Sequence, residues 1–319
     1  MEILYFSEQD DLFEQNGGAT IERRNLDALR TLFDVTQINF KNKKRSFLQK
    51  IHSIFFSPIP LLYTKRDCQN ISKQIKNSNC DIVFIESTRV GYFAKVAKKT
   101  GKTVITFAHN CESVFVRMRH NYLLTYLTRK QEKLSLKYSD KIIMLNERDL
   151  NDFKRLYKMS HSPSIKLIPI TLEDELTVPI LKELKAHKKG RRGIFFGSNF
   201  AANYNGIKWF VDNVAPNINA DIYIYGKGFD RCFELQRSNV FVIGKTDNIP
   251  KMMIDADFAV LPIFEGSGMK VKTCHMLMYG KKCFLSQESL EGYDLQQNSY
   301  VLPEFGKHPH FVVLKLSLE

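Results

Sequence analysis

The residues with the clearest chemical potential lie between positions 262 and 280, in the stretch PIFEGSGMKVKTCHMLMYG. A largely apolar run over residues 256–261 precedes them and predicts a buried parallel strand. A loop follows, and we expect a helix from about Met269 to Gly280. The loop residues are Glu265, Gly266, Ser267 and Gly268. Glycines around a serine at a helix N-terminus favour an anion, because backbone N–H groups converge there and no Cβ blocks the approach.

Two lysines, Lys270 and Lys272, add positive charge beside this predicted loop. Together with the helix dipole, they would stabilise a bound phosphate or a similar anion. An ordinary glycine-rich turn with solvated lysines accounts for the same residues. The loop by itself leaves both interpretations open, so the surrounding pattern has to decide between them.

That pattern, GSGMKVKTCHMLMYGK, resembles the donor-binding signature of retaining glycosyltransferases of family four, which have the GT-B fold. The matching residues are Gly266, Ser267, Gly268, Lys270, Lys272, Gly280 and Lys281. The resemblance implies that this loop binds a nucleotide sugar, with Glu265 and Met269 as further donor contacts. His275 stands where the family has the glutamate that holds the ribose hydroxyls. A neutral imidazole accepts one hydrogen bond, whereas a carboxylate accepts several.

The composition describes a globular protein with an anionic partner. The chain has 319 residues, which suits about two domains, with 44% hydrophobic and 25% charged residues. The formal net charge is +13 and the sequence pI is about 9.3, which favours phosphates, nucleic acid or an acidic membrane face as partners. Nothing resembles a helix-turn-helix or a single-strand-binding module, so we expect no nucleic-acid partner.

The cysteine spacing and the hydropathy predict a cytoplasmic protein without a structural metal. The six cysteines are Cys68, Cys80, Cys111, Cys232, Cys274 and Cys283. Their spacing fits no metal-binding motif, and we interpret them as reduced thiols. No signal peptide precedes the first predicted strand, and no apolar run reaches the roughly 18 residues that span a bilayer.

Strand and helix patterns alternate along the whole chain, which predicts parallel sheets with helices on both faces. The resemblance makes this an α/β protein of the GT-B fold, with two Rossmann-like doubly wound domains facing a central cleft. We expect an acceptor-side domain over residues 1–172 and a nucleotide-sugar-binding domain over residues 191–319. The charged, helix-prone residues 173–190 between them are interpreted as a linker.

Two features of the first half could contact a ligand. Gly17 and Gly18 precede a helix predicted over residues 20–32, and a glycine pair there lets the backbone approach a ligand at the sheet edge. A simple loop accounts for the pair equally well. In the resembled family the same pair lies near the donor diphosphate or the acceptor, so Gly18 is a predicted donor contact.

His109 follows a strand predicted over residues 104–108 and opens the sequence His109-Asn110-Cys111-Glu112. A histidine just past the carboxyl end of a strand lies where α/β proteins bind ligands, although a lone histidine is often a plain polar loop residue. The segment resembles the H-N-x-E segment of the same glycosyltransferases. The resemblance implies that His109 is a catalytic residue that positions the transferred sugar and is not a displacing nucleophile.

Two basic segments complete the first half. Residues 41–56 alternate basic and apolar side chains. They include Lys41, Lys43, Lys44, Arg45, Phe47, Leu48, Lys50, Ile51, Ile54, Phe55 and Phe56. Such a segment predicts docking to an anionic membrane, unless its apolar side chains pack on their own domain and leave a solvated basic face. Residues 121–138 predict a long basic helix, in which Arg129-Lys130-Gln131-Glu132 resembles the R-x-x-E segment of the family.

The second half places further candidates after predicted strands. Gly197 and Ser198 follow a strand over residues 193–196 and precede a helix expected over residues 207–214, so Gly197 could offer backbone donors to a phosphate or sugar. Strands over residues 221–225 and 240–243 lead to further predicted contacts, Lys227, Gly244 and Lys245. In relatives the loop after the second of these strands holds the base, although both are also plausible as plain sheet-edge loops. The arginine and lysine that many relatives carry after the first strand are missing, so Lys227 or Lys270 would have to supply that charge.

The sequence therefore predicts a glycosyltransferase that moves a sugar with retention from a UDP- or GDP-linked donor to a hydroxyl of a glycan or lipid-linked acceptor. The resemblance implies bacterial surface polysaccharide assembly, at the inner face of the plasma membrane. We expect no cofactor and no metal, and mainly electrostatic catalysis. Two alternatives stay open: a catalytically degenerate GT-B subunit that binds a partner or membrane, and a sugar-nucleotide 2-epimerase.

Overall fold

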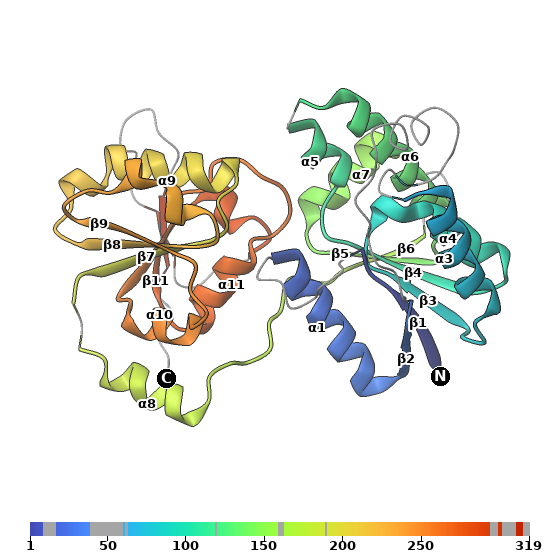
Figure 1. Cartoon of the computed structure of the whole chain (residues 1–319), viewed down its shortest axis with the longest axis horizontal. Helices are drawn as coiled ribbons and strands as arrows, with labels where there is room; N and C mark the ends of the chain where they lie inside the picture. The colour runs from blue at the N-terminus through green and yellow to red at the C-terminus, as the bar shows by residue number, and fades with distance from the viewer. Residues whose placement is uncertain are drawn as a thin grey trace. The chain divides into compact units, whose positions relative to one another are not determined.

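The computed structural model describes residues 1–8, 17–38, 60, 63–118, 120–158, 163–188, 190–293, 299–301 and 311–314. The chain forms two compact units, Met1–Pro169 and Ile170–Glu319, each built on its own sheet (Figure 1). The basic amphipathic segment of residues 41–56 lies outside the described residues. Within them, no helix combines the length and the apolar character needed to cross a bilayer.

The first unit contains a parallel six-stranded sheet in the order β2-β1-β3-β4-β5-β6. The strands are β1 (Glu2–Phe6), β2 (Asp34–Gln37), β3 (Ile82–Ile85), β4 (Thr103–Ala108), β5 (Lys141–Met144) and β6 (Ser164–Leu167). Since the chain moves outward in opposite directions from β1 and β3, the topological switch point lies between these two strands. Ligands of such sheets bind beyond the carboxyl ends of the strands at this point.

Helices pack on both faces of this sheet, which explains why its strands are apolar runs rather than alternating patterns. The helices are α1 (Gly17–Leu32), α3 (Lys65–Asn77), α4 (Gly91–Lys99), α5 (Glu112–Met118), α6 (Tyr122–Tyr138) and α7 (Glu147–Tyr157). On one face, Leu4 and Phe6 of β1 share a buried core with Ile71 of α3 and Phe93 of α4. On the other face, the Tyr5 hydroxyl donates a 3.0 Å hydrogen bond to a backbone carbonyl of α1.

The second unit contains a seven-stranded sheet in the order β12-β13-β11-β10-β7-β8-β9. The strands are β7 (Arg192–Phe196), β8 (Asp221–Tyr225), β9 (Val240–Gly244), β10 (Phe258–Leu261), β11 (Lys282–Ser286), β12 (Ser299–Val301) and β13 (Phe311–Leu314). Strands β7 to β11 are parallel, whereas β13 runs antiparallel to both its neighbours. Their order puts the switch point between β7 and β10.

The helices of the second unit are α8 (Val178–Ala186), α9 (Ala201–Asn213), α10 (Ile249–Asp255) and α11 (Val271–Met278). The segment predicted as a linker, residues 173–190, belongs by its contacts to this unit. Ile180 and Leu184 of α8 pack against the core that includes Ile194 and Val260. The α/β class with two doubly wound parallel sheets, predicted from the sequence, is confirmed.

Three helix starts differ from the predicted ones. Helix α1 begins at Gly17, so the glycine pair lies in its first turn. Helix α11 begins two residues after Met269, because Lys270 at its N-cap position has an extended backbone, with φ −96° and ψ 106°. Helix α9 begins six residues before the predicted start. Gly206 lies inside it, where a Cβ would come 1.8 Å from the Pro262 carbonyl oxygen. This glycine therefore permits close packing and does not mark a turn.

Asn146 caps the N-terminus of α7, and this cap offers a stability test. The Asn146 side chain accepts a 2.8 Å hydrogen bond from the Asp149 backbone N–H and donates a 2.9 Å bond to the Asp149 carboxylate. We expect Asn146→Ala to lower the free energy of unfolding by about 1 kcal/mol, or about 2–4 °C in melting temperature. Asn146→Ser, which keeps the accepting oxygen, should lose less than half of that. An equal loss in both variants would show that the cap contributes little.

Candidate active site

The second unit brings two loops together at its switch point. The loop after β7 contains Gly197 and Ser198, and the loop after β10 spans residues 262–270. Helices α9 and α11 begin after these loops, with Phe200 and Lys270 at their N-cap positions. The side chain of neither residue accepts a hydrogen bond from a backbone N–H of its helix. No cap side chain therefore occupies the first N–H groups of these two helices, and both helix dipoles favour an anion there.

Lys272 lies beside the first of these loops, in the first turn of α11. Its Nζ is buried and donates a 2.7 Å hydrogen bond to Oδ1 of Asn203, whose Nδ2 donates a 2.7 Å bond to the Ser198 carbonyl. A Cβ added at Gly197 would lie 2.6 Å from Lys272 Nζ, and the φ of Gly197 is 156°. Glycine is thus required at position 197 both by the backbone and by the ammonium group.

Charge is unbalanced at Lys272. Burial, with a smaller contribution from the nearby charge of Lys270, lowers the pKa of Lys272 to about 7. In the part of the chain that the structure describes, no carboxylate forms an ion pair with it, and its hydrogen bond goes to a neutral amide. A buried ammonium with only a neutral partner is costly, and an anion would relieve that cost.

Lys270 has a different environment, although the sequence placed both lysines beside the anion. Its Nζ donates to Glu288 Oε1 at 2.7 Å and to the Gly268 carbonyl at 2.9 Å. The ammonium is therefore already paired with a carboxylate and ties the glycine loop to residues after β11. Of the two lysines, Lys272 has the charge that a ligand would neutralise.

His275 occupies the buried face of α11 and contacts a carboxylate that sequence reasoning missed. Its Nε2 lies 3.5 Å from Oε1 of Glu175, and the Tyr279 hydroxyl donates a 3.2 Å hydrogen bond to Oε2 of the same glutamate. The other ring nitrogen, Nδ1, is buried, and no described residue forms a hydrogen bond with it. Glu175 precedes α8, a hundred residues away in sequence, so no local pattern could have identified it.

The remaining predicted donor contacts are more dispersed. Lys227 and Lys245 are exposed, after β8 and β9, and Lys245 pairs with Asp247 at 2.8 Å. Gly244 is buried, and its carbonyl accepts a 2.7 Å hydrogen bond from a backbone N–H after β8. All three follow the same sheet edge as the loops after β7 and β10. They extend the candidate site along that edge without contacting Lys272.

Within the β10 loop, the predicted residues fall into two groups. Glu265 is exposed and accepts a 3.3 Å hydrogen bond from the side chain of Asn205. Met269 is buried, with its sulfur 3.4 Å from the backbone nitrogen of Ile170. The Ser267 Oγ is buried and has no hydrogen-bond partner in the described part of the chain. Ser267 therefore has an unsatisfied polar group in the loop, as expected of a ligand contact, whereas Met269 packs internally.

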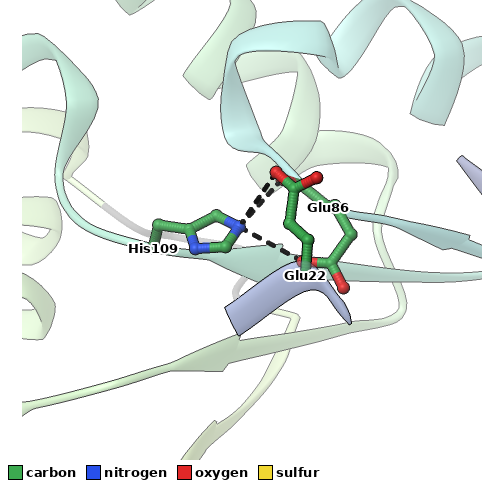
Figure 2. A group of neighbouring side chains, drawn as sticks. All are labelled: Glu22, Glu86 and His109. Carbon is green, nitrogen blue, oxygen red and sulfur yellow. Dashed lines mark hydrogen bonds and ion pairs between the residues drawn. The ribbon is translucent and has the colours of Figure 1, made fainter. Parts of the chain in front are cut away.

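The first unit places His109 in a buried cluster with two glutamates (Figure 2). His109 follows β4, Glu86 follows β3, and Glu22 lies on α1, so the cluster lies at the carboxyl edge of the sheet next to its switch point. The His109 Nε2 lies 3.2 Å from Oε2 of Glu86 and 3.6 Å from Oε1 of Glu22. Gly18 lies one helical turn before Glu22.

Opposing effects set the charge of this cluster. Burial lowers the pKa of His109, but the hydrogen bond and charge of Glu86, together with Glu22, outweigh it and raise that pKa above its ordinary value. Burial raises the pKa of Glu22 to about 8, against the opposing charge of His109. The cluster therefore favours an imidazolium beside a protonated Glu22 at neutral pH. The Nδ1 of His109 is buried and has no hydrogen-bond partner among the residues that the structure describes.

The three ligand atoms of Glu22, Glu86 and His109 lie within 4.8 Å of one another, which is close enough for a shared metal ion. However, the Glu86 carboxylate already accepts hydrogen bonds from the Tyr5 hydroxyl at 2.9 Å and from the Asn25 amide at 2.9 and 3.2 Å. With His109, these donors occupy both oxygens of Glu86. The cluster is thus complete as a hydrogen-bonded network, and an ion would have to replace the His109–Glu86 contact.

Sequence reasoning missed both glutamates of the cluster, although signals existed. Glu86 directly follows the apolar run Ile82–Ile85, at the position where a ligand-binding residue of a parallel sheet is expected. Glu22 shares one face of α1 with Asn25 and Leu26, all buried, so a carboxylate there interrupts a core-facing stripe. Neither pattern indicates that the two glutamates contact His109.

The loop that follows His109 is held by buried acids. Asp149 accepts a 3.1 Å hydrogen bond from the Cys111 backbone N–H, and Glu132 of α6 accepts from the Ser113 backbone and from the Tyr157 hydroxyl. Burial raises the pKa of Glu132 to about 7, against these hydrogen bonds. The segment that resembles R-x-x-E therefore anchors the start of α5.

Residues 191–302 match the family model described as glycosyl transferases group 1. The match lies within the second unit and includes Lys272 and both loops at its switch point. A search of curated proteins finds no match to the chain.

Solved structures show the same fold over nearly the whole chain. Sucrose-phosphate synthase from Thermosynechococcus elongatus aligns with a TM-score of 0.63 and 14% identity, covering 91% of this chain and 82% of that one. HepE from Anabaena in complex with UDP-glucose aligns with a TM-score of 0.61 and 12% identity, covering 90% and 80%. A glycosyltransferase from Rickettsia africae aligns with a TM-score of 0.55 and 12% identity, covering 90% and 79%. The chain has the GT-B fold.

The Glu22 carboxyl group predicts how stability depends on pH. Its pKa is raised in the folded state from 4.5 to about 8, so its contribution to stability is complete below about pH 4.5 and is lost as the pH rises through 8. Glu22→Gln keeps the shape of the protonated side chain. Between about pH 5 and pH 8, we expect the melting temperature of this variant to fall less than that of the wild type. The difference should be about 2–4 °C for each kcal/mol of folding stability that the wild type loses and the variant keeps.

The control is Asp27→Asn, which removes an exposed carboxylate from the same helix and should follow the wild-type curve. Parallel curves for Glu22→Gln and the wild type would contradict the raised pKa of Glu22.

Proposed function

We propose that this protein transfers a sugar from a nucleotide-sugar donor to a hydroxyl acceptor, with retention of the anomeric configuration. The observation that carries the proposal is Lys272, a buried ammonium whose partners among the described residues are the Asn203 amide and the Phe195 ring, but no carboxylate. It lies beside two helix N-termini at the switch point of the unit that matches the group 1 glycosyl transferases. The diphosphate of the donor is an anion of the right size and charge to bind both helix ends at once.

Lys272 contributes most when the sugar leaves. As the bond from the sugar to the diphosphate breaks, its electron pair stays on the phosphate oxygen and negative charge increases there. An ammonium and backbone N–H groups held in place for that charge stabilise the transition state more than the bound donor. The Lys270–Glu288 pair keeps the glycine loop in position without competing for the phosphate.

His109 is the catalytic residue we propose for the first unit. Its imidazolium is oriented by Glu86, which leaves Nδ1 with one free hydrogen-bonding position. A donor N–H at this point would bind a hydroxyl of the transferred sugar and hold it for attack by the acceptor. Glu86 and Glu22 are positioning residues in this proposal, since they act through His109.

The ribose of the donor is proposed to bind near His275. In the resembled family a glutamate on this helix holds the ribose hydroxyls, whereas here the helix has a histidine next to Glu175. The side chain of Glu175 is 39% exposed, so its carboxylate can accept hydroxyl hydrogen bonds while it contacts His275. We propose that Glu175 supplies the carboxylate that the helix lacks.

The nucleotide is proposed to be UDP, because HepE, whose fold this chain shares, was solved with UDP and with UDP-glucose. The further setting rests on the resemblance alone. It comprises a glycan or lipid-linked acceptor, assembly of a bacterial surface polysaccharide, and a cytoplasmic protein docked at the inner face of the membrane, partly through residues 41–56. We propose that the reaction needs no metal ion.

A catalytically degenerate subunit is the second candidate, favoured by the replacement of the motif glutamate by His275. Transfer or hydrolysis of a nucleotide sugar at a measurable rate would exclude it. A sugar-nucleotide 2-epimerase would give a changed sugar nucleotide without any acceptor, whereas a transferase needs the acceptor to form product.

The role of Lys272 predicts a loss of donor affinity. We expect Lys272→Met, which keeps the length of the side chain without its charge, to weaken UDP binding about 100-fold in titration calorimetry, because a buried charge–phosphate contact is lost. Lys282→Met removes an exposed lysine from β11 of the same unit and should change affinity less than about two-fold. Equal affinities of Lys272→Met and the wild type would refute the diphosphate site.

The role of His109 predicts a loss of turnover. We expect His109→Asn to lower kcat for sugar transfer about 100-fold or more and to leave UDP affinity unchanged within about two-fold, since the residue holds the sugar and not the diphosphate. His120→Asn is the matched control. This exposed histidine has a φ of 54°, which asparagine tolerates. Wild-type kcat in His109→Asn would remove His109 from the reaction.

A further inference from the structure

The outer face of α6 has an unusual distribution of side chains. Its buried side is mostly polar and packs on α4 and on the residues just before it. The Gln131 side chain accepts a 3.0 Å hydrogen bond from the Tyr92 backbone N–H, and Ser135 Oγ donates to the Thr88 carbonyl at 3.1 Å. The buried residues are Thr125, Thr128, Gln131, Glu132, Ser135 and Leu136. Large apolar side chains are thus left for the solvent side, which reverses the usual pattern of a surface helix.

Apolar and aromatic side chains concentrate at the N-terminal end of this outer face. Tyr122 is 63% exposed, Leu123 51% and Tyr126 56%, and Met118 at the end of the preceding helix α5 is 46% exposed. These four are among eleven strongly exposed large apolar residues in the described part of the chain, and they lie within nine positions. A concentration of this kind marks an interaction surface rather than ordinary surface variation.

Basic side chains continue the same face. At 100° per residue, Tyr122, Lys133, Tyr126, Lys137 and Lys130 fall within one 80° sector, and all five are exposed. The Lys130 ammonium lies 4.5 Å from the centre of the Tyr126 ring. The only acidic residue of α6 is Glu132, which is buried on the other side.

Arg117 adds a further cation at the apolar end, with its guanidinium 5.0 Å from the centre of the Tyr122 ring. Apolar rings with cations beside them match the boundary of a bilayer, where tyrosines lie at the headgroup level and lysines extend toward anionic headgroups. A protein partner would not need this combination, and a nucleic acid would need no exposed leucine or methionine.

We propose that the outer face of α6, together with Met118 and Arg117, docks the protein on an anionic lipid bilayer. The rings of Tyr122 and Tyr126, with Leu123, enter the headgroup region, and Lys130, Lys133 and Lys137 contact anionic headgroups. This surface is separate from residues 41–56. It also stands whether or not the proposed sugar transfer is correct, because vesicle binding is measured without any donor.

The test measures co-sedimentation of the full chain with vesicles of phosphatidylcholine and phosphatidylglycerol. We expect binding to these vesicles and little binding to pure phosphatidylcholine. The triple variant Lys130→Gln, Lys133→Gln, Lys137→Gln should bind about 100-fold more weakly, since three charges at about 1 kcal/mol each correspond to roughly that factor. The triple variant Tyr122→Ser, Leu123→Ser, Tyr126→Ser should also lose binding, by at least about 10-fold.

The matched control removes three exposed lysines from α3 of the same unit, as Lys65→Gln, Lys73→Gln, Lys76→Gln. Weakening by the control equal to that of the α6 lysine variant would overturn the proposal, because it would show attraction by net charge alone. Unchanged binding of the serine variant would overturn it as well. Tighter binding to a single-stranded oligonucleotide than to the vesicles, lost in the α6 lysine variant, would assign the surface to nucleic acid instead.

A single substitution tests the same surface without disturbing the fold. Tyr126→Trp should show a blue shift of its fluorescence on addition of anionic vesicles, because the indole would enter the interface. Absence of that shift, with vesicles in excess so that all the protein is bound, would contradict insertion of this face.

Discussion

The buried ammonium of Lys272 is the feature on which the rest of the second unit depends. Hydrogen bonding to the Asn203 amide does not compensate for its burial, which is why its pKa falls to about 7. Gly197 makes room for it, and Asn203 links it to the loop after β7. An apolar side chain of the same size would be more stable at this position in the free protein. The arrangement is therefore best explained by an anion that completes it.

The first unit also buries ionisable groups, but there most of them are carboxyl groups instead of an ammonium. Glu22 and Glu86 are buried around His109. Burial raises the pKa of Glu22 to about 8, and the two glutamates raise the pKa of His109, which favours a charged imidazole beside a protonated Glu22. Buried acids farther along, Asp149 and Glu132, hold the backbone that carries His109. Each unit thus presents one charged group at the switch point of its sheet, and each group is oriented by side chains from other elements.

Much of the fold could be predicted from the sequence, because strands of a parallel sheet covered on both faces are short apolar runs. The strand predicted over residues 193–196 is such a run, and it agrees with β7, Arg192–Phe196, to within one residue. The start of α9 could not be predicted, because Asn203 and Gly206 are typical of turns, and the close contact of Gly206 with Pro262 exists only in the folded chain.

For the candidate site, the sequence predicts individual residues but not the partners that they contact. Local sequence identified Lys270 and Lys272 together, whereas their different roles depend on Glu288 and Asn203, which the fold brings in from other elements. The contact of His275 with Glu175 was invisible for the same reason. The partners that neutralise or stabilise a charged side chain come from distant parts of the chain. A local motif therefore predicts which charged residues are present, but not which of them lack an opposite charge nearby.

Proton uptake on binding tests the central claim most directly. Titration calorimetry of UDP into the wild-type protein at about pH 8, in two buffers with different ionisation enthalpies, counts the protons exchanged. Lys272 is mostly neutral there in the free protein, so a diphosphate bound beside it should draw close to one proton from the buffer. Binding of UDP with no proton uptake would contradict the account, because the diphosphate would then lie away from this ammonium.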